Sequence, residues 1–201
     1  MKVLLLSPYP EGILPALSTF SDEFEITAKP ISKDYCINGC FDYLISYGYR
    51  HILRKEILDI FGRNAINLHI SLLPFCRGAH PVAWSIIDRA PTGVTIHLLD
   101  EGLDTGDILL QQQTPPIIDR HETFSTLYKK LTDSVEQLFK SNWVDLRAGR
   151  CEARKQHGPA TYHRSKDLDK FIDFMPQKWD TSIWNFCNMA NIRHPLLDDK
   201  S

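Results

Sequence analysis

Short hydrophobic runs that end at turn residues dominate the first part of the chain. They occupy residues 2–6, 24–28 and 42–46. Runs of this length, bounded by turn signals, are typical of buried strands in a parallel sheet. Residues 53–61 then carry apolar positions at helical spacing, and Gly62 stands where a helix would end. Strand, helix and following strand predict a βαβ unit with a right-handed crossover.

The next apolar stretch, residues 65–74, predicts a buried strand that carries two polar side chains. Asn67 and His69 are two positions apart, so they point to one face while their apolar neighbours point to the other. Burying both without partners would cost a few kcal/mol each, roughly. They are therefore either hydrogen-bonded structurally or placed at the strand end beside a cleft. Pro74 and the turn-prone residues 77–78 favour the strand end, where α/β sheets bind ligands.

The later elements are predicted from the same two patterns, which are helical spacing and the alternation of side chains along a strand. A glycine-punctuated loop at residues 100–107 separates two of the predicted strands and contains three aspartates. The remaining predicted elements are a helix at 80–88 with Pro81 in its first turn, paired strands at 93–99 and 107–113, an amphipathic helix at 122–147 capped by Gly149, and a small helix within 179–191.

Together these elements predict an α/β fold, a Rossmann-like open and mostly parallel twisted sheet with helices on both faces. A chain of 201 residues that is 43% hydrophobic can bury one full core and add a short extension. The segment 154–167 is polar, turn-rich and basic. We therefore predict a main domain at residues 1–149 and a short C-terminal extension at 150–201.

Charge and cysteine usage exclude several classes of protein. A formal net charge of −2 argues against a nucleic-acid binder that works through a broad basic field. The first apolar run is too short for a signal peptide or a membrane span. Five cysteines without CxxC spacing argue against a disulfide framework and a zinc knuckle. We expect a cytoplasmic, reduced protein with no nucleic-acid or membrane partner. The aspartate loop lacks EF-hand spacing, so no metal is expected there.

Three motifs in order resemble the folate-dependent formyltransferases: Asn67-Leu-His69 with Ser71-Leu-Leu-Pro74, then Gly93-Val-Thr-Ile-His97, then Asp100-Glu-Gly-Leu-Asp-Thr-Gly-Asp-Ile108. This family includes glycinamide ribonucleotide transformylase, methionyl-tRNA formyltransferase and the sugar N-formyltransferases. The resemblance makes residues 1–149 the catalytic domain and implies 10-formyltetrahydrofolate as co-substrate, with no metal.

The same resemblance implies the site residues. Asn67, His69 and Asp104 match the catalytic Asn, His and Asp of the family. The pterin is expected to pack against the loop after the preceding strand and against the aspartate loop. The implied cofactor-binding residues are Tyr47, Gly48, Tyr49, Arg50, His51, Ile52, Asp100, Glu101 and Gly102.

These residue types suit acyl transfer. An amide donor such as Asn67 can stabilise negative charge on the formyl oxygen, and one such donor is worth about 2.7 to 4 kcal/mol. His69 can relay a proton near neutral pH, worth roughly a hundred- to ten-thousandfold in rate. Asp104 can orient the imidazole, directly or through a water, and accept the amine proton. His97 either lines the site or satisfies a core hydrogen bond.

The acceptor amine is predicted from what surrounds the motifs. Where glycinamide ribonucleotide transformylase has a phosphate loop, this chain has Ser7-Pro-Tyr-Pro-Glu-Gly12, and two prolines remove amide donors. The larger C-terminal barrel and basic surface of the transfer-RNA branch are not expected either. Segments 77–84 and 158–164 look similar to the sugar N-formyltransferases, whose acceptor is an amino sugar on a nucleotide diphosphate. The predicted substrate-binding residues are Arg77, Gly78, Trp84, His97, Tyr162 and Arg164. Trp84 or Tyr162 is expected to stack on a base or sugar, and Arg77, Arg164 or Lys166 is expected to contact the diphosphate.

Several alternatives remain open. The acceptor is alternatively glycinamide ribonucleotide or methionyl-tRNA, or water, which would make the protein a 10-formyltetrahydrofolate hydrolase. A non-catalytic folate- or nucleotide-binding module is a further alternative. The basic tail residues are equally consistent with a solvated surface that pairs with Asp167 and Asp169. The aromatics Trp179, Trp184 and Phe186 either pack back on the domain or form the interface of a homodimer.

Overall fold

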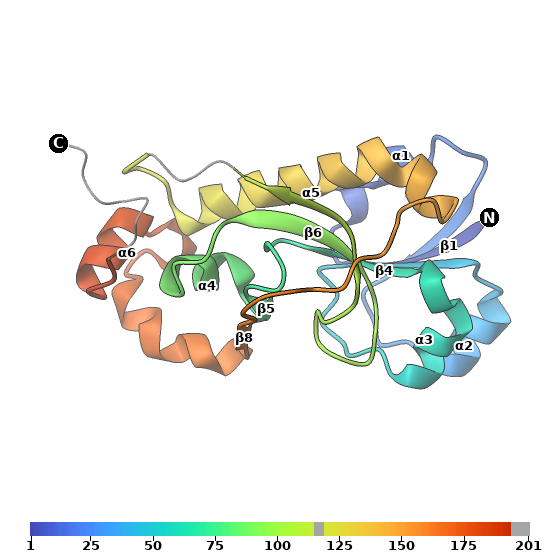
Figure 1. The fold of residues 1–201 in the computed structure, drawn as a ribbon, viewed down its shortest axis with the longest axis horizontal. Helices are drawn as coiled ribbons and strands as arrows, with labels where there is room; N and C mark the ends of the chain where they lie inside the picture. Colours follow the sequence, from blue (N-terminus) through green and yellow to red (C-terminus); the bar gives the residue numbers. More distant parts are fainter. Residues whose placement is uncertain (115–118, 194–201) are drawn as a thin grey trace. The chain divides into compact units, whose positions relative to one another are not determined.

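The computed structural model of the protein describes residues 1–114 and 119–193 (Figure 1). Residues 194–201 of the predicted C-terminal extension lie outside the described residues. The chain packs as two units. Unit 1 comprises 1–69, 95–111 and 135–156, and unit 2 comprises 70–94, 112–134 and 157–201. The predicted functional division at residue 149 stays a prediction.

The main sheet has six strands in the order β2-β1-β3-β4-β6-β7. The first four are parallel to one another, and β6 runs antiparallel to β4. This confirms the predicted α/β class with a mostly parallel sheet. The strands are β1 (Lys2–Leu6), β2 (Glu23–Thr27), β3 (Tyr43–Tyr47), β4 (Ala65–His69), β5 (Arg77–Gly78), β6 (Gly93–Leu98), β7 (Ile108–Gln113) and β8 (Tyr162–His163).

The α-helices are α1 (Leu14–Leu17), α2 (Lys33–Gly39), α3 (Lys55–Phe61), α4 (Pro81–Ile87), α5 (Phe124–Arg147) and α6 (Ile183–Met189). The 3-10 helices are η1 (Pro10–Gly12), η2 (Gly62–Asn64), η3 (Ser165–Phe174) and η4 (Lys178–Asp180). Helices α3, α4, α5 and α6 lie where the sequence predicts helices. Helix α2 was not predicted, because Cys36 is its only buried residue, which leaves no apolar periodicity to detect.

Strand β3 shows how unit 1 covers its sheet on both faces, because alternate side chains of a strand point in opposite directions. Leu44 belongs to the core cluster that includes residues of α2 and α3. On the opposite face, the Tyr43 ring meets Trp143 of α5 edge-on with ring centroids 5.2 Å apart. Tyr47 Oη donates to Glu136 Oε1 of α5 over 2.7 Å. Helices therefore cover both faces, as predicted.

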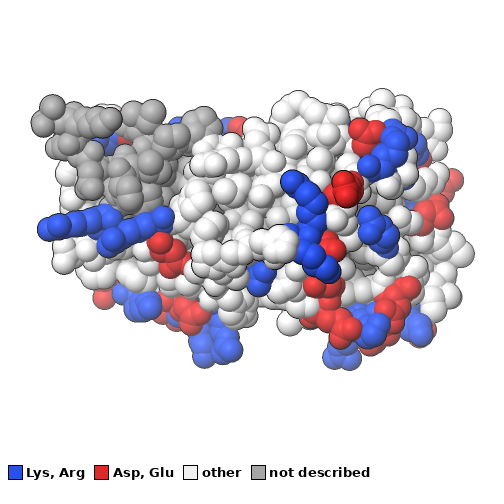
Figure 2. Space-filling model, in the orientation of Figure 1, with Lys and Arg blue, Asp and Glu red and all other residues white. Residues whose placement is uncertain are grey.

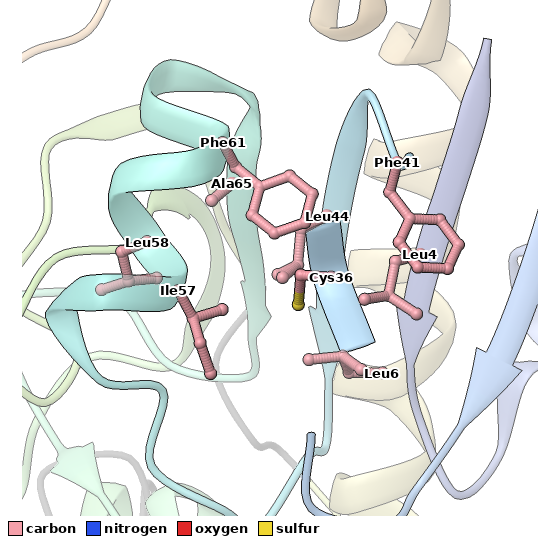
Figure 3. Packing of buried hydrophobic residues seen from close by; sticks show 9 residues of the cluster. All are labelled: Leu4, Leu6, Cys36, Phe41, Leu44, Ile57, Leu58, Phe61 and Ala65. Carbon is pink, nitrogen blue, oxygen red and sulfur yellow. The ribbon is translucent and has the colours of Figure 1, made fainter. Parts of the chain in front are cut away.

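The core cluster on the α2 and α3 side is purely apolar apart from one thiol (Figure 3). Side chains of α3 face those of β1 and β3 in this view, and each fully buried Leu or Phe contributes about 1.5 to 3 kcal/mol of transfer free energy. The cluster holds the parallel strands in place, and with them the carboxyl end of β4. Its members are Leu4, Leu6, Cys36, Phe41, Leu44, Ile57, Leu58, Phe61 and Ala65.

Unit 2 has an aromatic core of its own. Phe186 of α6 is fully buried and meets the Phe124 ring edge-on at 5.0 Å. The Phe171 ring of η3 lies 6.2 Å from Phe186 and 5.9 Å from Trp84. Phe186 therefore packs within its own unit, whereas Trp179 is 42% exposed. The predicted homodimer stays a prediction.

Acidic and basic side chains lie intermixed on the face drawn in Figure 2. Such mixing matches the near-zero formal charge of the sequence. No helix among residues 1–114 and 119–193 combines the length and apolarity that crossing a membrane requires.

Candidate functional site

The carboxyl end of β4 delivers the first two site residues. Asn67 and His69 are 9% and 7% exposed, and both lie on the face of β4 that Ala65 shares with the core cluster. The register with β6 sets Asn67 opposite His97. A row of polar side chains therefore crosses two strands near the carboxyl end of β4. In α/β folds, ligands bind outside the carboxyl ends of the strands.

Four polar side chains converge within unit 1. Asn67 Nδ2 donates to Asp104 Oδ1 over 3.2 Å and lies 3.2 Å from His97 Nε2. Asp104 Oδ2 lies 3.7 Å from His69 Nδ1, which is longer than a direct hydrogen bond. Asp104 Oδ1 lies 3.5 Å from His97 Nε2. The structure thus brings the three predicted catalytic residues together with His97, which was predicted from the sequence as a substrate-binding residue.

The hydrogen bonds of His97 define its protonation pattern. Its Nδ1 lies 2.8 Å from the backbone oxygen of Leu98, and a carbonyl oxygen only accepts, so Nδ1 carries the hydrogen. In the neutral ring Nε2 is then an acceptor, facing the amide of Asn67. Both amide hydrogens of Asn67 are therefore directed at protein acceptors, namely His97 and Asp104.

The loop that carries Asp104 is shaped by its own side chains. Asp100 Oδ1 accepts from the backbone N–H of Gly102 over 3.1 Å and from Thr105 Oγ1 over 2.6 Å. Asp104 itself has φ of +53°, a left-handed conformation that Asp and Asn tolerate better than most residues. The carboxylate thus stands on a tight, internally hydrogen-bonded turn.

The predicted pterin loop after β3 is anchored at its first residues. The Tyr47 side chain is buried and bonded to Glu136, so its ring faces the core of unit 1. Gly48 has φ of +67°, and a Cβ at this position would lie 1.8 Å from Tyr9 Oη. Tyr49 Oη donates to the backbone oxygen of Lys29 over 2.9 Å. The chain is therefore held closely where it leaves the strand.

The rest of that loop and the start of the aspartate loop are exposed. Arg50, His51 and Ile52 are all exposed, and the His51 ring meets Tyr49 edge-on at 5.2 Å. Glu101 lies 3.9 Å from Lys55 Nζ as an exposed pair, which contributes little to stability. These side chains are accessible, and their predicted contact with a pterin stays a prediction.

Three of the predicted substrate residues meet in unit 2. Strands β5 and β8 pair in parallel, with Arg77 opposite Tyr162 and Gly78 opposite His163. Tyr162 is 50% exposed. Residues more than eighty positions apart in the sequence are thereby brought side by side, and their role in substrate binding stays a prediction.

Trp84 is less accessible than the predicted role in stacking requires. Its indole is 3% exposed and stacks face to face on the His163 ring, with centroids 3.6 Å apart and planes 1° apart. His163 Nε2 lies 2.6 Å from Asp88 Oδ2, which fixes the imidazole. Arg164 is exposed, and its backbone N–H donates to Asp167 Oδ2 over 2.7 Å. One face of Trp84 is thus already covered by a protein side chain.

Cysteine and the metal-ligating residue types are the remaining side chains whose chemistry the described structure addresses. Burial, together with the nearby Asp88 carboxylate, raises the pKa of the Cys76 thiol to about 12, which makes it a poor nucleophile. Within residues 1–114 and 119–193, no three His, Cys, Asp or Glu side chains are grouped as metal ligands would be.

Three side chains that shape these surfaces were not predicted. Glu136 bonds Tyr47 from helix α5, His163 stacks on Trp84, and Gln156 Nε2 donates to the backbone oxygens of Asp104 and Gly106 over 2.9 and 2.8 Å. Gln156 belongs to the polar segment 154–167, and no motif or spacing in the sequence distinguishes it from its polar neighbours.

Comparisons with known proteins identify relatives of this chain. The family model for formyl transferase matches residues 37–142. Methionyl-tRNA formyltransferase of Thermodesulfovibrio yellowstonii is 36% identical over 168 residues, which are 82% of this chain and 51% of that protein. The chain spans about half the length, or less, of the curated relatives it matches.

Solved structures extend the similarity. The formyltransferase PseJ from Anoxybacillus kamchatkensis superposes with a TM-score of 0.87 at 37% identity, covering 92% of this chain and 97% of that one. A sugar N-formyltransferase from Shewanella sp FDAARGOS_354 gives a TM-score of 0.75 at 21% identity, over 97% and 89% of the two chains. The second match shows a shared fold.

Proposed function

Because the chain belongs to the formyl transferase family, we propose that it transfers a formyl group from 10-formyltetrahydrofolate to the amine of a nucleotide-linked amino sugar. The observation that carries the proposal is the convergence of Asn67, His69 and Asp104 at the carboxyl end of β4. The solved PseJ complex contains tetrahydrofolate and a UDP-linked formamido sugar, which supports both the donor and the acceptor.

The proton balance of the reaction assigns roles to these residues. The amine nitrogen bonds to the formyl carbon, the bond from that carbon to the folate nitrogen breaks, and one proton leaves the amine while another reaches the folate nitrogen. Asp104 accepts the amine proton, since it is the carboxylate of the cluster and a carboxylate offers only acceptor oxygens. His69 gives a proton to the folate nitrogen and regains one from Asp104, whose Oδ2 lies 3.7 Å from its Nδ1.

Stabilising the formyl oxygen requires one hydrogen of the Asn67 amide. One of these hydrogens is directed at a charged carboxylate and the other at a neutral imidazole. Hydrogen bonds to charged groups are about twice as strong. We therefore assign the hydrogen that faces His97 as the one that moves to the oxyanion, while Asp104 keeps its partner.

The loop after β1 favours a sugar acceptor over a ribotide with a free phosphate. A Cβ on Gly12 would lie 1.9 Å from the Glu136 carboxyl group, so this carboxylate sits directly against the loop backbone. Its side chain is only 15% exposed. A phosphate bound to the same backbone would meet this carboxylate at close range, and Lys140 Nζ, which lies 3.9 Å from Glu136 Oε2, offsets its charge only in part. Glu136 thus reinforces the argument from the two prolines in that loop.

The nucleotide of the acceptor is assigned to the surface around β5 and β8. Tyr162 is the half-exposed aromatic there and suits stacking on a base. Arg77 lies opposite it in the strand pairing and suits a diphosphate through its forked donors. Trp84 supports this surface through its stack with His163.

The test is a panel of amines incubated with 10-formyltetrahydrofolate and read by a mass gain of one formyl group. It contains UDP- and dTDP-linked amino sugars, glycinamide ribonucleotide, methionyl-tRNA and a control without amine. We expect turnover with a nucleotide-linked amino sugar at a kcat/KM at least a hundredfold above the other amines. A preference for methionyl-tRNA or for glycinamide ribonucleotide would show that the proposed acceptor is wrong. Release of formate in the control without amine would show that the protein hydrolyses 10-formyltetrahydrofolate and does not transfer the formyl group.

A further inference from the structure

The aspartate loop is tied to a segment about fifty residues further along the chain. Arg154 and Ile108 exchange backbone hydrogen bonds of 2.7 and 2.9 Å, which lays the 154 segment against the start of β7. Two residues later, Gln156 Nε2 donates to the backbone oxygen of Asp104 over 2.9 Å and to that of Gly106 over 2.8 Å. All of these residues belong to unit 1.

The geometry suits a clamp that acts on the backbone. A primary amide has two N–H donors on one nitrogen, and here both are directed at carbonyl oxygens of the same turn. Gln156 is half-buried, so these bonds are partly shielded from water. One carbonyl lies in the peptide plane between Asp104 and Thr105 and the other in the plane between Gly106 and Asp107. Holding both therefore fixes the orientation of the plane that directly follows Asp104 and of a second plane in the same turn.

This turn determines where the proposed base stands. Asp104 has φ of +53°, and its carboxylate makes the 3.2 Å bond to Asn67 and the 3.7 Å approach to His69. Relaxation of the backbone at this position would move the carboxylate relative to both. Misplacement of a reacting group by about 1 Å costs on the order of a hundredfold in rate.

We propose that Gln156 is a positioning residue for formyl transfer, acting through the backbone of Asp104 rather than by touching the substrate. This inference rests on the proposed function of the site. It predicts that the Gln156 amide supports turnover (kcat) with little influence on the affinity for either substrate.

The neighbouring Lys155 provides a matched control. Its Nζ lies 3.0 Å from Asp107 Oδ1, on the same loop, but the lysine side chain is 77% exposed. Exposed ion pairs of this kind contribute little to stability. If any side-chain contact could stabilise the loop, substitutions of Lys155 and of Gln156 would both lower the rate. If the two bonds from Gln156 hold the loop, as proposed, only substitution of Gln156 lowers the rate.

The experiment compares wild type with Gln156→Met, which keeps the side-chain length and lacks the donors, and with Lys155→Met. For Gln156→Met we expect kcat to fall about 10- to 100-fold, with both KM values within about threefold of wild type. Lys155→Met is expected to stay within about twofold in kcat. If Gln156→Met folds poorly, Gln156→Glu decides, because it also lacks the amide donors and keeps a polar side chain.

Hydrogen exchange of residues 100–108, followed by mass spectrometry, gives a readout that does not depend on turnover. We expect faster exchange in this loop for Gln156→Met and no change for Lys155→Met. Unchanged kcat in a folded Gln156 variant, or unchanged exchange of the loop, overturns the inference. A wild-type protein that formylates no amine while the variant still loosens the loop would instead contradict the proposed function and leave the clamp in place.

Discussion

Replacement of Asp104 by Asn tests the role of the carboxylate with little change in shape. Asn has the same number of side-chain atoms and tolerates the left-handed backbone that this position requires. Its Oδ1 can still accept the hydrogen bond from Asn67 that Asp104 accepts over 3.2 Å. What disappears is the negative charge that faces His69 and the capacity to accept the proton of the amine.

The expected loss follows from that single change. General base catalysis contributes about a hundred- to ten-thousandfold, so kcat for Asp104→Asn should fall by this factor, or about 2.7 to 5.4 kcal/mol in activation free energy at 1.36 kcal/mol per tenfold. Folding should be spared. In contrast, Asp104→Ala adds a left-handed residue without a polar side chain, which costs roughly 1 to 2 kcal/mol of stability.

The assay follows formylated product by mass at saturating 10-formyltetrahydrofolate, and thermal unfolding of each variant in parallel. Both variants should be nearly inactive, but only the alanine protein should melt measurably lower. Retention of more than a tenth of wild-type kcat by Asp104→Asn would refute the assignment of the base. Equal melting losses in both variants would refute the argument from backbone conformation.

Three further predictions concern the frame of the site. Gly48→Ala combines a φ of +67° with a Cβ 1.8 Å from a tyrosine hydroxyl, so urea denaturation should show a loss of about 1 to 3 kcal/mol, and an unchanged midpoint would contradict this. Asp22, whose side chain is 3% exposed, accepts two bonds of 2.7 and 2.8 Å from Arg147 Nη2; Asp22→Asn should lower the unfolding free energy by about 1 to 3 kcal/mol. Because burial raises the pKa of the Cys76 thiol from 9.0 to about 12, iodoacetamide at pH 8 should modify the exposed Cys40 first in peptide maps. Reaction of Cys76 at the rate of Cys40 would contradict the burial argument. The same pKa shift predicts that the contribution of this thiol to the free energy of unfolding is complete below pH 9 and is lost as the pH rises toward 12.

Elements with strong local signals were predictable from the sequence, and those made by tertiary pairing were not. Strand β1 matches its prediction at both ends, and the alternation of side chains along β4 is enough to predict that Asn67 and His69 share one face. Strands β5 and β8 are two residues long each, so their hydrophobic pattern has no period to read. These two strands form because two segments of unit 2 that are far apart in the sequence pair with each other.

The same limit applies within the site. The relation of Asp104 to the β4 residues came from the family resemblance, since a loop carries no periodic signal of where its side chains point. Gln156 and the oxygen of Asp104 are 52 positions apart, and His163 and Asp88 are 75 apart. Hydrogen bonds over such separations follow from the completed packing, which composition and spacing do not encode locally.

His97 shows why two interpretations that looked exclusive in the sequence are compatible in the fold. Its Nδ1 satisfies a backbone carbonyl, as a structural core histidine would, and its ring is 1% exposed. That bond fixes the tautomer and thereby leaves Nε2 as an acceptor for the amide of Asn67. A neutral acceptor at this point orients Asn67 yet releases its hydrogen more readily than a carboxylate would. The structural bond of His97 therefore determines which ring atom faces Asn67 in the proposed reacting centre.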